Sequence, residues 1–239
     1  MELENFKKEF YNKIKYINYN IEDEQINKFY QYMNLMLKWN ENINLTAITN
    51  PEDIIEKHFV DSLTILNEIS ENDKVIDVGT GAGLPGIPLS ICSKASFLLL
   101  DSLNKRINFL KEVKSTLNLK NIELEHGRAE DFAKTKKYRE EFDVAVSRAV
   151  APMNVLIEYL LPYVKVGGKV ICMKGPKAEE ELNQINNGIQ ILGGNLEKIY
   201  NIELGEEKLE RKIIVIKKIK NTPTKYPRKA GIPAKEPLK

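Results

Sequence analysis

The chain has 239 residues and a net charge of +2, with 42% hydrophobic and 29% charged side chains, a composition typical of soluble globular proteins. Its apolar runs stay well below the ~20 residues that a membrane span needs, and the polar start Met1–Asn5 is unlike a signal peptide, so we expect no membrane association. Cys92 and Cys172 lack metal-ligand spacing, which predicts buried thiols in a reducing cytoplasm and no metal site.

The first third of the sequence is predicted to be helical. Apolar residues recur at helical spacing from Leu3 to Ile17 and from Glu22 to Asn40. A third helix begins at Asn50-Pro51, with Asn as the N-cap and Pro in the first helical position, and we expect a break near Asp61-Ser62. These elements predict a helical cap over residues 1–70, packed on the main sheet.

From Lys74 onward the pattern alternates between strands and helices. We expect strands at 74–78, 96–101, 121–125, 142–147, 168–173, 195–204 and 211–219, and helices at 86–92, 103–118, 152–164 and 178–193. The last two strands follow each other without a helix, so they can form a hairpin that places one antiparallel strand in a parallel sheet. This α/β plan over residues 71–220 resembles the seven-stranded, Rossmann-like fold of class I S-adenosylmethionine-dependent methyltransferases.

The first of these strands ends in a carboxylate, Asp77, and is followed by Gly79, Gly81 and Gly83 and then by a helix. Glycines allow positive φ angles and the close approach of a ligand. The sequence from Gly81 also fits the dinucleotide pattern G-x-G-x-x-G, but Pro85 has no N–H for a pyrophosphate. Asp77 would repel a phosphate and suits a ligand with a cationic end, such as S-adenosylmethionine. The simplest alternative is a turn that merely needs glycines.

The ends of the next strands supply further candidate ligands. Asp101 ends the second strand, where a carboxylate can accept both ribose hydroxyls of an adenosine ligand. We assign the residues that follow it, Ser102 and Leu103, to the same cofactor site. Lys105 and Arg106 open the next helix and are expected to face solvent or an RNA phosphate.

An acid just after the third strand is placed to bind an adenine amino group, and Glu130 lies there, after Ala129. Arg148 ends the fourth strand, where the transferable methyl group would be presented, and its fork can bind a phosphate or a carboxylate. Lys174 ends the fifth strand and is a candidate RNA ligand, although it fits a plain strand-end lysine equally well.

The C-terminal segment is basic. From Lys217 onward there are eight basic residues against one acid, Glu236, which favours a polyanionic partner, most simply nucleic acid. Residues 221–239 are rich in Pro, Gly and Lys and are predicted to form an extended tail; a solvated, disordered end is the alternative. Tyr226 could stack on a base, and Arg228 and Lys229 are candidate phosphate contacts.

Several motifs together resemble the RsmG (GidB) family of small-subunit rRNA methyltransferases. They are Asn44-Leu45-Thr46-Ala47, the block from His58 to Leu63, the glycine corner Asp77–Gly86, and the segments Lys105–Leu110, Gly127–Glu130, Ser147–Ala149 and Tyr226–Pro233. The resemblance implies transfer of a methyl group from S-adenosylmethionine to N7 of one guanine in 16S rRNA, with rRNA or the small ribosomal subunit as partner. By family position, the cofactor contacts would be Gly79, Leu84, Ala129, Glu130 and Arg148; Leu84 stands where many members have Phe.

The implied chemistry needs no general base, because guanine N7 carries a lone pair and no proton. Arg148 and Lys174 would therefore act by positioning alone. His58, Asp61 and Ser62 are candidates for a polar link between the helical cap and the site. Three other functions remain open: a methyltransferase for another RNA, a nicotinamide-dependent oxidoreductase, and a non-catalytic RNA-binding protein. We expect a cytoplasmic monomer.

Overall fold

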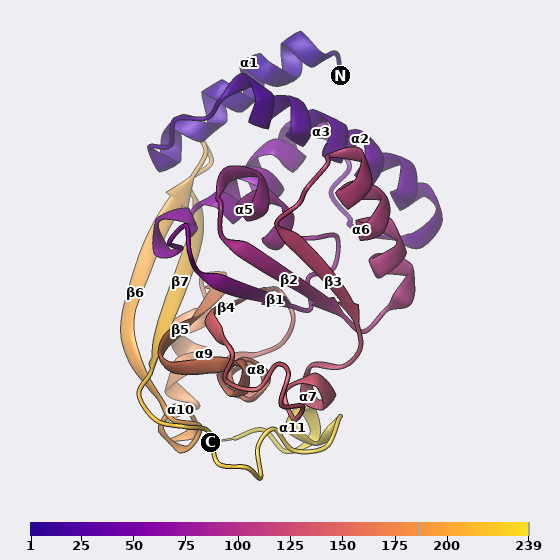
Figure 1. Cartoon of the computed structure of the whole chain (residues 1–239). Helices are drawn as coiled ribbons and strands as arrows, with labels where there is room; N and C mark the ends of the chain where they lie inside the picture. Colours follow the sequence, from indigo (N-terminus) through magenta and orange to yellow (C-terminus); the bar gives the residue numbers. More distant parts are fainter. Residues whose placement is uncertain (186, 239) are drawn as a thin grey trace.

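The computed structural model describes residues 1–185 and 187–238. Its seven strands form one sheet in the order β3-β2-β1-β4-β5-β7-β6 (Figure 1). They are β1 (Lys74–Val78), β2 (Ser96–Asp101), β3 (Ile122–His126), β4 (Phe142–Arg148), β5 (Val164–Lys174), β6 (Gly194–Leu204) and β7 (Leu209–Lys218). Strand β7 runs antiparallel to both of its neighbours, so the predicted terminal hairpin is confirmed. All seven predicted strands are present, and β5 begins at Val164 rather than at position 168.

The central strands are apolar on both faces because helices cover both sides of the sheet. Side chains that alternate along β1, β2 and β4 belong to two separate hydrophobic clusters. Val75 and Val144 pack with the N-terminal helices, whereas Ile76 and Ala145 pack with α8 (Met153–Leu160) and the 3-10 helix η4 (Leu161–Tyr163). This two-sided cover leaves the carboxyl ends of the strands as the place where a ligand can reach the backbone.

The N-terminal helices share one hydrophobic core with the sheet. They comprise α1 (Leu3–Ile14), η1 (Lys15–Ile17), α2 (Asp23–Ile43), α3 (Pro51–Ile54), η2 (Ile55–Val60), α4 (Asp61–Leu63) and η3 (Leu66–Glu68). Phe10, Phe29 and Phe59 form its aromatic centre, with ring centroids 4.9 Å apart for Phe10 and Phe29 and 5.0 Å for Phe29 and Phe59. The division of the chain at residue 70 stays a prediction.

The third helix starts where the sequence predicted, because the Asn50 side chain accepts hydrogen bonds from the N–H groups of Glu52 and Asp53. The expected break near Asp61-Ser62 is wrong. The helix continues to Leu63, and its irregularity lies earlier, in the π-helical turn η2. Wide turns of this kind occur often at functional sites.

The remaining helices are α5 (Gly86–Cys92), α6 (Asn104–Thr116), α7 (Ala129–Phe132), α9 (Ala178–Asn183), α10 (Gly188–Ile191) and α11 (Ile232–Lys235). The single helix expected over 178–193 is wrong: α9 and α10 are two short helices, and residue 186 of that range lies outside the described part of the chain. Gly188 has a low helix propensity, which favours a break there. Within the described ranges, no helix is both long and apolar enough to cross a membrane.

The C-terminal segment is where the structure departs most from the prediction. After β7 the chain folds back below α8 and ends near the short helix α11 (Figure 1). Tyr226 is only 8% exposed and packs in the hydrophobic cluster of α8. Residues 222–238 thus include a part that packs on the protein, whereas the sequence suggested a free extended tail; Lys239 lies outside the described residues. Arg139 holds the backbone of the C-terminal segment by donating to the carbonyls of Thr222 (2.7 Å) and Tyr226 (2.8 Å).

Candidate functional site

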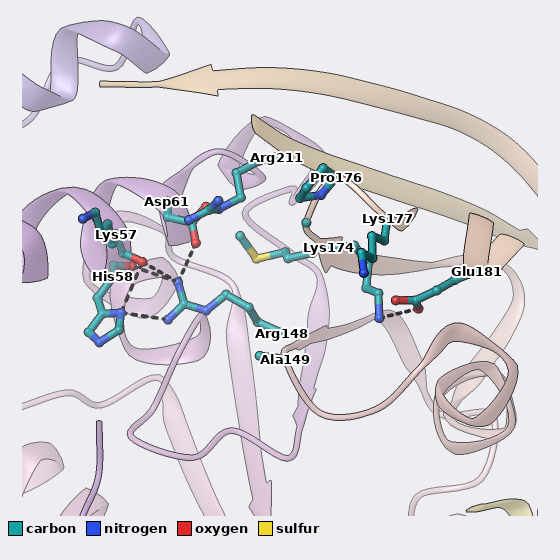
Figure 2. A pocket seen from close by; sticks show the side chains of 12 residues that line it. Lys57, His58, Asp61, Arg148, Ala149, Lys174, Pro176, Lys177, Glu181 and Arg211 are labelled. Carbon is teal, nitrogen blue, oxygen red and sulfur yellow. Dashed lines mark hydrogen bonds and ion pairs between the residues drawn. The ribbon is translucent and has the colours of Figure 1, made fainter. Parts of the chain in front are cut away.

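Two cavities lie side by side at the carboxyl ends of the parallel strands. The first, of about 430 Å³, follows β1, β2 and β3 and is called the glycine-corner cavity; its lining includes Gly79, Asp101, Ser102, Leu103, Ala129 and Glu130. The second, of about 600 Å³, follows β4 and β5 and is called the basic cavity; its lining includes Lys57, His58, Asp61, Arg148, Lys174 and Arg211 (Figure 2).

The segment that leaves β4 separates the two cavities. Arg148 and Ala149 line the basic cavity, whereas the next residue, Val150, lines the glycine-corner cavity. Ala149 adopts a positive φ of 56°, an uncommon conformation for a residue with a side chain, and such strained positions cluster at functional sites. Any two ligands in these cavities would meet across this three-residue wall.

Glycine is required at the mouth of the first cavity. Gly79 has φ 73°, and a Cβ atom at this position would lie 2.6 Å from Cγ2 of Val150. The N–H groups of Gly79 and Thr80 donate to the carbonyl of Leu100 (2.8 and 3.1 Å), which fixes the loop against β2. A side chain at position 79 would therefore push into the wall between the two cavities.

Asp77 does not line the cavity. Its carboxylate is fully buried behind the loop, where Oδ2 accepts hydrogen bonds from the Thr80 hydroxyl (2.6 Å) and the Gly86 N–H (2.9 Å). Burial raises the pKa of Asp77 to about 6, although these hydrogen bonds oppose the shift. From the sequence we expected this acid to meet a cationic ligand; the structure shows instead that it holds the loop, and Oδ1 is left without a partner among the described residues.

Asp101 lies at the cavity wall, as expected, but it is already engaged. It accepts hydrogen bonds from the N–H groups of Gly81 and Leu103 (both 2.9 Å) and from Arg106 Nη1 (3.2 Å). Arg106 is thus paired with this carboxylate, and its contact with RNA stays a prediction. The preceding residue, Lys105, is exposed. The bond to Gly81 ties the glycine loop to the end of β2.

Glu130 is buried at the other side of this cavity, with 6% of its surface exposed. Its Oε1 accepts a hydrogen bond from the N–H of Gly231 (3.0 Å), which belongs to the C-terminal segment and also lines the cavity. Gly81, Gly83 and Leu84 belong to the loop between β1 and α5 but are absent from the described lining. The predicted cofactor residues are therefore a wall (Gly79, Asp101–Leu103, Ala129, Glu130) and a supporting layer behind it.

Asp61 organises the basic cavity. One of its oxygens contacts Arg148 Nη1 at 2.7 Å, and the other contacts Arg211 Nε at 3.0 Å (Figure 2 labels all three residues). Arg148 Nη1 also donates to the carbonyl of Lys57 in the π-helical turn (3.1 Å). The expected polar link between the helical cap and the site is thus present: Asp61 ties α4 to β4 and β7. Ser62 supports it from behind by donating to the His58 carbonyl (2.5 Å).

His58 is neutral at physiological pH. Burial and, to a smaller extent, the nearby Arg148 charge lower its pKa to about 4. Its Nδ1 lies 3.5 Å from Arg148 Nη2, and its Nε2 lies 2.8 Å from the Thr46 hydroxyl. A neutral ring at this position adds no charge repulsion to the neighbouring guanidinium.

The basic cavity has an excess of positive charge. Its lining has five basic side chains, from Lys57, Arg148, Lys174, Lys177 and Arg211, against two acids, Asp61 and Glu181. Lys174 Nζ lies 2.7 Å from Glu181 and donates to the carbonyl of Ala151 (3.0 Å), so it is held in place. Such a cavity favours an anionic ligand. Arg148 was predicted for both the cofactor and the acceptor; it lines the basic cavity, and both roles stay predictions.

Among the described residues from Lys217 onward, no basic side chain lines this cavity. Arg228 is bound to the buried Glu158 of α8, and the Tyr226 ring is covered by the core, so neither is free for the RNA contact that the sequence suggested. Lys229 is exposed, and its RNA contact stays a prediction. Sequence reasoning missed Lys57, Lys177 and Arg211, because no local motif marks them. It also missed Gly231, which lies in the motif Tyr226–Pro233 but was not assigned to the site. Among the residues that the structure describes, no cluster of acids, His and Cys could hold a metal ion.

Comparisons with known proteins agree with this geometry. The GidB family profile, described as rRNA small subunit methyltransferase G, matches residues 25–213. The ribosomal RNA small subunit methyltransferase G of Clostridium tetani is 50% identical over 221 residues, which cover 91% of this chain and 92% of that protein. The Alkaliphilus oremlandii protein of the same name is 50% identical over 226 residues, covering 93% and 95%. Among solved structures, M. jannaschii TYW2 in complex with AdoMet shares the fold, with a TM-score of 0.52 at 15% identity over 66% of this chain and 75% of that one.

Proposed function

The chain belongs to the GidB family of ribosomal RNA small subunit methyltransferases G, and from that premise we propose that it transfers the methyl group of S-adenosylmethionine to N7 of a guanine in 16S rRNA. The observation that carries the proposal is the pair of cavities on either side of Arg148–Val150. One is walled by carboxylates and backbone, and the other by cations. The first suits an adenosine-bearing methyl donor and the second suits a nucleotide with its phosphates.

The glycine-corner cavity fits the cofactor by the chemistry of its walls. Asp101 is placed for the ribose hydroxyls and Glu130 for the adenine amino group, while Gly79 leaves room for close approach. Asp77 supports this cavity from behind, because its carboxylate holds the loop through Thr80 and Gly86. When bound, S-adenosylmethionine supplies an electrophilic methyl group on a sulfonium.

The basic cavity suits a guanosine lifted out of its RNA stack. Enzymes that do chemistry on a base act on single-stranded nucleic acid or extrude the base into a pocket, and phosphate contacts supply a large share of the affinity. The lining of this cavity, next to the segment Arg148–Val150, includes the basic residues Lys57, Lys177 and Arg211. The substrate class is 16S rRNA or the small ribosomal subunit, and we place the reaction in the cytoplasm, with the enzyme acting as a monomer.

No residue has to accept a proton, because guanine N7 presents a free lone pair. The protein therefore has to align two reactants, and alignment alone can contribute several kcal/mol. Arg148 is suited to this task since Asp61 and the Lys57 carbonyl fix its guanidinium. The His58 ring lies beside the guanidinium and, being neutral, does not repel its positive charge.

The test is transfer of labelled methyl from S-adenosylmethionine to rRNA and ribosomal particles from cells that lack this gene, followed by borohydride–aniline cleavage at N7-methylguanine. We expect label in 16S rRNA and one new cleavage position. Label without a cut would move the target to another atom. Absence of label on both rRNA and particles, with the cofactor bound, would reject 16S rRNA as the substrate.

A further inference from the structure

The C-terminal segment contributes to the cofactor cavity in two ways. Gly231 lines the cavity, and its N–H donates to Glu130 Oε1 at 3.0 Å. Glu130 is buried, and within the described contacts this N–H is its one hydrogen-bond donor from the protein. Buried carboxylates without donors are costly, so the orientation of Glu130 depends on the presence of the segment.

A second buried carboxylate clamps the same segment. Glu158 of α8 has no exposed surface, and Arg228 binds it through the backbone N–H (2.7 Å), Nε (3.0 Å) and Nη2 (2.7 Å). Such bidentate arginine–carboxylate contacts fix geometry strongly. The next residue along α8, Tyr159, lines the glycine-corner cavity. The clamp thus anchors the segment to the helix that forms the cavity wall.

A third contact joins the segment to the chain around Glu130. Arg139 donates to the carbonyls of Thr222 and Tyr226, and its Nη1 also donates to the carbonyl of Ala133 (3.3 Å), at the end of α7. Helix α7 carries Ala129 and Glu130, two of the predicted cofactor contacts. The segment, α7 and α8 therefore form one hydrogen-bonded unit around the adenosine side of the cavity.

We propose that residues Tyr226–Gly231 are part of the binding site for an adenosine-bearing cofactor, with Gly231 orienting Glu130 and Arg228 acting as a positioning residue through Glu158. The inference rests on the proposed function, since it takes the glycine-corner cavity as the cofactor site. It reassigns Arg228 from RNA binding to the cofactor side of the enzyme. Cofactor binding and the seating of the segment are then linked equilibria, so that each strengthens the other.

The test compares cofactor affinity in the full-length wild type, Arg228→Met and Lys235→Met, measured by calorimetry with S-adenosylmethionine and with methylthioadenosine. Lys235 is an exposed cation of the same segment, so its variant matches the change in charge and side chain. Arg228→Met should weaken both ligands by about tenfold or more, because the competent state becomes a minor one. Lys235→Met should bind both ligands as the wild type does.

In turnover, Arg228→Met should raise KM for the cofactor and leave KM for RNA unchanged. Arg228→Lys should recover part of the lost cofactor affinity.

A measurement on the unmodified protein decides the matter even where Arg228→Met folds poorly. Amide hydrogen exchange over residues 226–231 should slow when S-adenosylmethionine is added. Equal cofactor affinity in all variants, or exchange unchanged by the bound cofactor, would overturn this inference and leave the proposed function standing. A wild type that binds no S-adenosylmethionine would instead reject the proposed function.

Discussion

The two cavities differ in how they fix their charged groups. In the glycine-corner cavity, Asp101 and Glu130 are held largely by backbone N–H groups of loops. In the basic cavity, Arg148 and Arg211 are held by the side chain of Asp61, which comes from a distant helix. The first cavity has acids in its wall, and the second has an excess of cations. The segment Arg148–Val150 therefore separates two environments of different charge, as the proposed pairing of a cationic methyl donor with a polyanionic acceptor requires.

The largest expected effect comes from blocking the first cavity alone. In Gly79→Asp the new side chain collides with Val150 and adds a negative charge at the loop, so we expect no measurable binding of S-adenosylmethionine by calorimetry. Circular dichroism should show an intact fold. Gly167→Asp is the matched control, because Gly167 also has a positive φ of 89° but a Cβ atom there would meet nothing within 4 Å. Unchanged cofactor affinity in Gly79→Asp would remove the cofactor assignment.

The second prediction changes the basic cavity and leaves the glycine-corner cavity intact. Arg148→Met removes the central guanidinium of the basic cavity, and a misplaced acceptor should lower kcat for rRNA methylation by about a hundredfold. Because Arg148 does not line the glycine-corner cavity, cofactor affinity should change little. A large loss of cofactor affinity would instead indicate that Arg148 contacts S-adenosylmethionine directly, as the family resemblance implies. Single-turnover kinetics and calorimetry on the same preparation distinguish the two results.

The third prediction concerns His58, whose pKa of about 4 lies below its ordinary value of 6.5. Between these values the unfolded chain binds a proton that the folded chain excludes, so stability is lost as pH falls from 6.5 toward 4. At pH 5 the loss amounts to about 2 kcal/mol. Urea unfolding at pH 7 and pH 5 should show that His58→Gln lacks this part of the pH dependence. Identical pH dependence in both proteins would contradict the neutral assignment of the ring.

The smallest expected effect is at the rim of the basic cavity. Lys177 is exposed there, and Lys177→Met should weaken binding of 16S rRNA only a few-fold while reducing the salt slope by about 0.7–0.9 for one lost phosphate contact. Filter binding over a series of salt concentrations measures the slope. The same substitution at Lys235, outside both cavities, should leave the slope unchanged. A slope that is equal in Lys177→Met and the wild type would place the RNA elsewhere.

The fold and the first cavity were largely predictable because their signals are local. Runs such as Phe97–Leu100 mark buried strands, Asp101 ends β2, and Gly79 directly follows β1. The second cavity was not predictable to the same extent, because Arg211 reaches it only through the antiparallel insertion of β7 beside β5. No short-range pattern encodes that neighbour.

The C-terminal segment shows how charge alone misleads. Its basic residues suggested a free tail, but the Arg228 side chain is held in place by Glu158, which is far away in the sequence. One signal was present: Glu158 is the only acid in the apolar helix Met153–Leu160. A lone acid in such a helix requires a buried cation, and Arg228 was an available candidate.

The position of β7 and the C-terminal segment also has a consequence for synthesis of the chain. Arg211 completes the basic cavity and Gly231 completes the glycine-corner cavity, so both depend on residues that leave the ribosome last. In Figure 1 these parts carry the yellow end of the colour scale; β7 lies beside β5, and the C-terminal segment lies below α8. A nascent chain that stops before β7 has the core strands β1–β5 but neither complete cavity. Premature termination therefore yields a chain that lacks part of the lining of both cavities.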